Sequence, residues 1–112
     1  MNLRINGQEL RFRISKEELE SLCSGSIVSQ STILPNSKKI EAQIIPNNSD
    51  DTMNLSDKNN IIILNVSKNL TQKFYDSLPS KEGLEKIQKI DDTNSITLFL
   101  EVDIRTQKRK KD

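Results

Sequence analysis

The dipeptide Asn6-Gly7 constrains the fold of this chain more than any other short feature. Both residues tolerate the positive φ angles of a tight hairpin turn, and alternating apolar residues flank them. We therefore predict a β-hairpin over residues 1–14, in which Arg4 faces Glu9 across the two strands. Successive strand residues point to opposite faces, so one face is apolar and the other polar. The apolar face comprises Met1, Leu3, Ile5, Leu10, Phe12 and Ile14, and the polar face comprises Asn2, Arg4, Glu9, Arg11 and Arg13.

A helix is predicted directly after this hairpin. Ser15 and Glu18 have the spacing of a capping box, and Gly25 suits the position that follows a helix C-terminus. A second helix is predicted after Ser67, because apolar residues recur there at four-residue spacing until Pro79.

Alternating or β-branched apolar residues predict further strands at 28–34, 40–44, 53–55, 60–67 and 95–104. Residues 80–94 are ambiguous, and their apolar spacing fits a short helix. The sequence shows no internal repeat. The order β-β-α-β-β-β-α-β predicts an α+β class, with a mainly antiparallel sheet on which two helices pack. We expect a single domain over residues 1–104 and a basic, disordered tail over residues 105–112.

Length and cysteine content narrow the class of protein. A chain of 112 residues suits one domain with one modest core. Cys23 is the single cysteine, so no intrachain disulfide forms, and a reducing cytoplasm is the expected location. No signal peptide is visible, and the longest clear apolar run, 61–64, is far too short to span a membrane.

The absence of histidine from the sequence removes the commonest catalytic base and most zinc sites. Cys23 then has no histidine to activate it, and we expect a buried structural thiol. No glycine-rich phosphate loop is present, and we expect no metal or cofactor. Glu101 and Asp103 would share one side of a strand, as in a carboxylate-dependent or metal-dependent enzyme. We interpret them instead as part of a solvated face.

Basic residues gather in two places. Residues 105–112 hold five basic residues and one acid, whereas residues 1–104 hold 12 basic and 15 acidic residues. Arginines on a sheet face can contact phosphates, but RNA-binding sheets add aromatic residues on that face, and Phe12 points the other way. We favour a solvated hairpin face over a binding surface. The candidate anion-binding or partner-binding residues are Arg4, Arg11, Arg13, Lys108, Arg109, Lys110 and Lys111.

The opening "MNLRINGQELRFRISKEEL" resembles a family of short, uncharacterised bacterial proteins that are frequent in Bacteroidetes. Members begin approximately M-K-I-R-I-x-x-x-x-I-R-x-R-L-x-x-x-E-V. The segments "DTMNLSDKNNIIILNVSKN" and "ITLFLEVDI" resemble the family's middle and last strands. The chain departs from the pattern after the last strand, where it is lysine-rich rather than acidic. The resemblance implies no activity or catalytic residue. The matching residues of the opening are Leu3, Arg4, Ile5, Leu10, Arg11, Arg13, Ile14 and Glu18.

These observations predict an uncharacterised small cytoplasmic protein that is a non-catalytic binding or regulatory module, with an unidentified protein as its partner. One alternative is a nucleic-acid-associated protein that uses the arginine-bearing hairpin face and the basic tail. The other is a carboxylate-dependent or metal-dependent enzyme built on Glu101 and Asp103.

Overall fold

The computed structural model describes residues 1–107 and contains eight strands and three helices in that range. The predicted α+β class is confirmed. The first half of the chain holds β1 (Asn2–Asn6), β2 (Glu9–Ile14), α1 (Lys16–Cys23), β3 (Val28–Ile33) and β4 (Lys39–Asn47). The second half holds β5 (Met53–Lys58), β6 (Ile61–Ser67), α2 (Lys68–Asp76), β7 (Leu84–Lys89), β8 (Ser95–Val102) and α3 (Ile104–Gln107).

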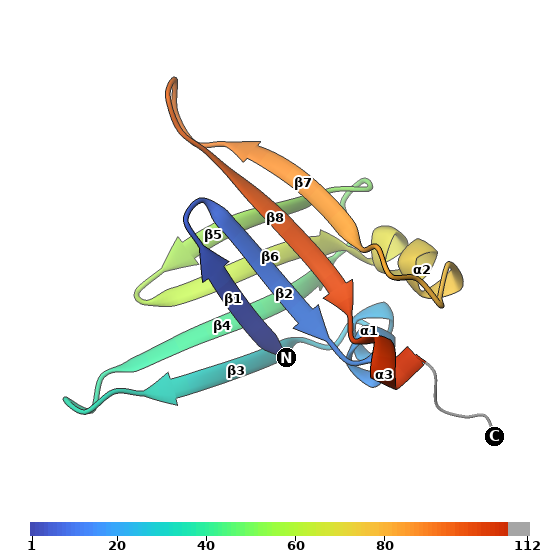
Figure 1. Ribbon diagram of the computed structural model, residues 1–112, viewed down its shortest axis with the longest axis horizontal. Coiled ribbons are helices and arrows are strands. Elements are labelled where there is room, and N and C mark those ends of the chain that lie inside the picture. The colour runs from blue at the N-terminus through green and yellow to red at the C-terminus, as the bar shows by residue number, and fades with distance from the viewer. Residues whose placement is uncertain (108–112) are drawn as a thin grey trace.

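The strands form two four-stranded sheets that lie face to face with their strands crossing (Figure 1). Sheet A has the order β1-β2-β8-β7, and sheet B has the order β3-β4-β6-β5. Each sheet consists of two antiparallel hairpins joined by one parallel pair, β2 with β8 and β4 with β6. The mainly antiparallel pairing is therefore as predicted, with the strands divided between two sheets.

The core fills the space between the sheets and continues beneath α1 and α2, which pack on each other at one end of the domain. The helices contribute Leu19, Leu22 and Phe74 to it. The largest fully buried apolar side chains are Phe12, Ile14, Leu19, Leu22, Ile44, Leu64, Val66, Leu98 and Leu100.

The two halves of the chain repeat one ββαββ unit, which corrects the expectation of no repeat. Met1-Asn2-Leu3 corresponds to Met53-Asn54-Leu55, and the helix starts Ser15-Lys16 and Ser67-Lys68 also correspond. The strand registers agree as well. Glu9 pairs with Thr97 in sheet A, and the equivalent residues Ile61 and Glu41 pair in sheet B. Sheet A therefore maps onto sheet B residue by residue.

The first hairpin turns at Gly7-Gln8 rather than at Asn6-Gly7, so Arg4 faces Arg11 and Asn6 faces Glu9. The predicted pairing of Arg4 with Glu9 is wrong. Of the two turn residues, Gly7 has a positive φ, 58°, and Gln8 does not, which fits a type II′ turn with glycine first. The shift of register is an even number of residues, and the side-chain period of a strand is two. The predicted inner and outer faces therefore survive.

Both long helices begin as the sequence predicts. Ser15 and Glu18 form a reciprocal capping box, and Ser67 accepts a hydrogen bond from the Leu70 amide. Gly25 has a φ of 95°, and its amide donates to the Leu22 carbonyl while the Ser26 amide donates to that of Ser21. This Schellman motif ends α1 and turns the chain toward β3.

The ambiguous segment 80–94 contains the edge strand β7 rather than a helix. It begins after Gly83, where a Cβ atom would lie 2.1 Å from the Leu100 carbonyl oxygen, so only glycine allows this approach to β8. Residues 105–107, predicted to be disordered, belong to α3. They are ordered because Gln107 donates to the Val102 and Ser80 carbonyls, both at 2.9 Å.

Candidate functional site

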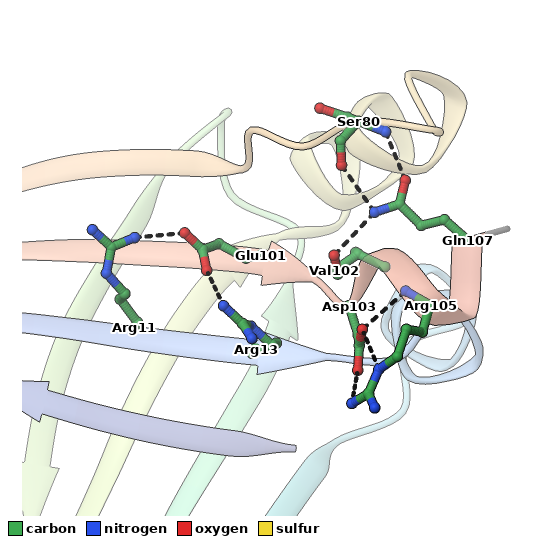
Figure 2. A network of polar contacts seen from close by, with 8 residues as sticks. All are labelled: Arg11, Arg13, Ser80, Glu101, Val102, Asp103, Arg105 and Gln107. Atoms are coloured by element: carbon green, nitrogen blue, oxygen red, sulfur yellow. Dashed lines mark hydrogen bonds and ion pairs between the residues drawn. The ribbon is translucent and has the colours of Figure 1, made fainter.

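Arg4, Arg11 and Arg13 lie on the outer face of sheet A. The parallel pairing of β2 with β8 gives Arg11 and Arg13 new neighbours, and Figure 2 shows Glu101 of β8 in contact with both. Arg13 lies beside Glu101, and Arg11 lies beside Phe99. We call this the arginine surface and define it as Arg4, Arg11, Arg13, Phe99 and Glu101.

Glu101 joins two of the arginines. One of its oxygens lies 2.6 Å from the Nη1 atom of Arg11, and the other lies 3.6 Å from the Nη2 atom of Arg13. The Arg11 guanidinium carbon also lies 3.9 Å from the centre of the Phe99 ring, which is a cation–π contact. These contacts fix Arg11, whereas the side chain of Arg13 remains 47% exposed.

Arg4 is the cation of this surface that has no carboxylate partner. It is exposed and stands directly opposite Arg11 in the β1–β2 ladder. Within residues 1–107, none of the ion pairs includes Arg4. Two like charges that face each other across a strand pair destabilise the sheet slightly, and a bound anion would relieve this repulsion. Two more carboxylates share this face: Glu9 lies two residues before Arg11 in β2, and Glu85 of β7 lies directly beside Phe99.

A polar hollow of about 250 Å³ continues from the arginine surface past the end of β2. Arg105 lies at its edge and forms an ion pair with Asp103 at 3.2 Å. Hydrogen bonding to the Arg105 guanidinium and backbone amide lowers the pKa of Asp103 below its usual value. Glu101 and Asp103 therefore contact different arginines rather than converging on one point. The hollow is lined by Met1, Asn2, Arg13, Ile14, Ser15, Glu18, Asp103 and Arg105.

The remaining candidates do not join this surface. Cys23 is half-buried rather than buried, in a hollow lined by Glu20, Gln72 and Tyr75. Burial raises the pKa of its thiol, and Asp76 and Glu20 act in the same direction, so the reactive thiolate is disfavoured. Lys108, Arg109, Lys110 and Lys111 lie outside the described residues.

Sequence reasoning missed Phe99 and the pairing role of Glu101. The expectation that no aromatic residue lies on the arginine face is wrong, because β8 supplies Phe99. The available signal was the alternation within "ITLFLEV", which places Phe99 and Glu101 on one face opposite to the buried Leu98 and Leu100. Their position beside Arg11 and Arg13 depends on a long-range parallel pairing that no local pattern specifies.

The fold and this surface define a small α+β domain of two repeated ββαββ units, with arginines on the outer face of one sheet. The chain belongs to a family of unknown function, DUF7009, whose model matches residues 1–112. No curated protein and no solved structure matches the chain. None of the helices in residues 1–107 has the length and apolar character that crossing a membrane requires.

Proposed function

We propose that this protein is a non-catalytic binding module whose arginine surface holds an acidic segment of a partner protein. The observation that carries the proposal is the comparison with sheet B. The positions equivalent to Arg4, Arg11 and Arg13 hold Ser56, Ile63 and Asn65, and the repeated unit has the same register there. The fold itself therefore does not require arginines, so their gathering on sheet A calls for another explanation.

The chemistry of the surface favours a carboxylate-bearing ligand. Arginine guanidinium groups bind carboxylates strongly, and Glu101 shows this here because it accepts a hydrogen bond from Arg11 and forms an ion pair with Arg13. Arg4 provides the same group without a partner in residues 1–107. Glu101 and Asp103, on which the enzyme hypothesis depends, are each engaged by arginine. This engagement supports a binding role over catalysis.

Nucleic acid is the second candidate, because Phe99 places an aromatic ring among the arginines. Two observations favour the acidic protein segment. The Arg11 guanidinium covers the Phe99 ring, so a nucleobase could stack on that side only by displacing it. Residues 1–104 also carry more acidic than basic residues, which opposes a long polyanion more than a short acidic segment.

Fluorescence anisotropy tests the proposal with two labelled probes, a flexible peptide rich in glutamate, glycine and serine, and single-stranded oligothymidylate. We expect the full-length protein to bind the peptide, and Arg4→Ala/Arg13→Ala to weaken this binding by about tenfold. The matched control is Ser56→Ala/Asn65→Ala, at the equivalent positions of sheet B, which should leave the affinity unchanged.

Two results would overturn the proposal. One is equal peptide affinity in both double variants, and the other is a preference for oligothymidylate at physiological salt. Replacing Lys108, Arg109, Lys110 and Lys111 by serine in the full chain separates the contribution of the C-terminal charges. Binding that disappears in this variant but survives Arg4→Ala/Arg13→Ala would assign recognition to those charges instead.

A further inference from the structure

We propose that the acidic segment binds as an added β-strand along the free edge of β1, with alternating apolar and acidic residues. This inference rests on the proposed function and specifies its ligand. The apolar side chains would enter a groove between β1 and β3, while the acidic side chains would lie beside Arg4 on the outer face. Extended peptides commonly extend an exposed sheet edge in this way.

The groove lies at one of two equivalent corners where the edges of the sheets meet. We call the meeting of β1 with β3 the open corner and that of β5 with β7 the closed corner. At the open corner a groove of about 120 Å³ separates the two edges. At the closed corner β5 packs against β7. The groove is lined by Leu3, Ile5, Gln30, Ser31, Thr32, Ile40, Glu41, Ala42 and Ile62.

The closed corner shows what chemistry the edge of β1 accepts. The Gln88 side chain accepts a hydrogen bond from the Leu55 amide at 2.6 Å and donates to the Leu55 carbonyl at 3.0 Å. A primary amide thus occupies the place that a peptide group of a neighbouring strand would take. Leu3 is the residue equivalent to Leu55, and Thr32 is equivalent to Gln88. Threonine has no amide, so the same contact cannot form at the open corner.

Smaller side chains keep the open corner open. Ala42 occupies the position that Leu98 fills at the closed corner, and both face the interior. Ile5 is left 59% exposed at the mouth of the groove, and Ile40 is left 42% exposed. Exposed apolar surface beside a free strand edge is a recognised binding feature, because it offers both main-chain hydrogen bonds and side-chain pockets.

Two inward-facing positions on the edge strands carry charges at the closed corner, and the equivalent two positions at the open corner do not. Asp57 of β5 lies on the face shared with Leu55, and Lys86 of β7 lies on the face shared with Leu84 and Gln88. Inward-facing charges of this kind discourage an incoming strand. The equivalent positions at the open corner hold Ile5 and Gln30, which carry no charge.

Charge complementarity selects the partner strand. Side chains on the outer face of a strand added to β1 would neighbour Asn2, Arg4 and Asn6, since the two sets share one face of the extended sheet. Arg4 forms no ion pair within residues 1–107. Arg13 of β2 lies directly opposite Asn2 of β1. An acidic residue opposite Arg4 would satisfy this cation, and apolar residues on either side of it would point into the groove.

Two labelled peptides of equal length and composition test this inference, one with valine and glutamate alternating and one with the two residues in separate blocks. We expect the full-length protein to bind the alternating peptide about tenfold more tightly. Thr32→Gln should reproduce the Gln88 contact and reduce the affinity for the alternating peptide to that for the block peptide. Ala42→Leu should reduce the affinity for the alternating peptide to the same level, because the larger side chain fills the groove. Ser29→Gln, which adds an amide on the outer face of β3, is the matched control.

The outcomes separate this inference from the proposed function. Equal affinity for both peptides, with loss of both in Arg4→Ala/Arg13→Ala, would overturn strand addition and leave the proposed function standing. No binding of either peptide would overturn both. If the protein is a dimer that the peptides do not dissociate, and Thr32→Gln converts this dimer to a monomer, the groove holds a second copy of this chain instead of the acidic segment. Slower hydrogen exchange of the Leu3 amide with the alternating peptide alone would support the inference.

Discussion

Phe12 and Leu64 occupy equivalent places in the two halves of the chain, and both are fully buried. Arg11 and Ile63 are equally equivalent, yet one forms an ion pair on the outer face of sheet A and the other is a half-buried aliphatic residue on sheet B. Buried inner positions of the strands must fill one shared core, so both halves keep those positions apolar. Outer positions are free of that requirement. The difference shows which residues serve the fold and which ones need a functional explanation.

The largest expected effect on stability comes from truncating buried core side chains at matched positions of the two halves. We expect Phe12→Ala to lower the free energy of unfolding by about 3–5 kcal/mol and Leu64→Ala by about 2–5 kcal/mol, because each leaves a cavity between the sheets. Urea denaturation followed by circular dichroism measures both. Ile87→Ala, at a residue that is 64% exposed, is the control, with a change within about 0.5 kcal/mol. A cost below about 1 kcal/mol in one half alone would contradict a common core.

A smaller effect is expected from the helix caps, which the two halves also share. Ser15→Ala and Ser67→Ala should each lower the free energy of unfolding by about 1 kcal/mol, because each removes the acceptor for the amide three residues later. Thermal and urea unfolding of the two single variants gives the values. Ser26→Ala, outside the helix, should change little. If the losses of unfolding free energy in the two variants differ by more than about 1 kcal/mol, the two caps are not equivalent.

Local patterns predicted the parts of the fold that local forces determine. The capping box at Ser15, the glycine stop at Gly25 and the alternation in the first hairpin depend on neighbouring residues, and all three are present. The hairpin turn was misplaced because asparagine and glycine both tolerate a left-handed conformation, and the choice between adjacent turns depends on the strand pairing. The inner and outer faces were unaffected, since the shift kept the parity of every side chain.

Long-range pairing could not be predicted. The edge strand β7 was ambiguous because its apolar residues fit a helix as well as a strand, and it is specified by pairing with β8. The arginines of the site were identified from the hairpin alone, but their partners Phe99 and Glu101 come from the other end of the chain. The groove depends on residues of four strands. The clearest missed signal was the repeat of Met-Asn-Leu and Ser-Lys, which relates the two halves.

The smallest expected effect concerns the turns, or tips, of the β3–β4 and β7–β8 hairpins, which differ in the side chain that accepts hydrogen bonds from the turn amides. In the β7–β8 tip, the Asp91 carboxylate accepts hydrogen bonds from the Thr93 and Asn94 amides at 2.9 and 2.8 Å. In the β3–β4 tip, the neutral Asn36 side chain accepts from the Lys38 amide at 3.0 Å. Both tips share the same backbone closure, from Leu34 to Lys38 and from Ile90 to Asn94. Lowering the pH should therefore weaken the hydrogen bonds to Asp91 in the β7–β8 tip and leave the hydrogen bond to Asn36 in the β3–β4 tip unchanged.

The amide hydrogen bonds from Thr93, together with those from Asn94, lower the pKa of Asp91 in the folded protein. A group with a lowered pKa stabilises the folded state fully above its unfolded pKa, which is about 3.9 for aspartate. This contribution disappears as the pH falls through the lower, folded value. We expect the amide NMR signals of Thr93 and Asn94 to shift and exchange faster in that acid range, while that of Lys38 stays constant. Asp91→Asn should abolish the pH dependence, because an amide does not titrate. Equal acid sensitivity at both tips would mean that a global change, rather than this carboxylate, governs the β7–β8 tip.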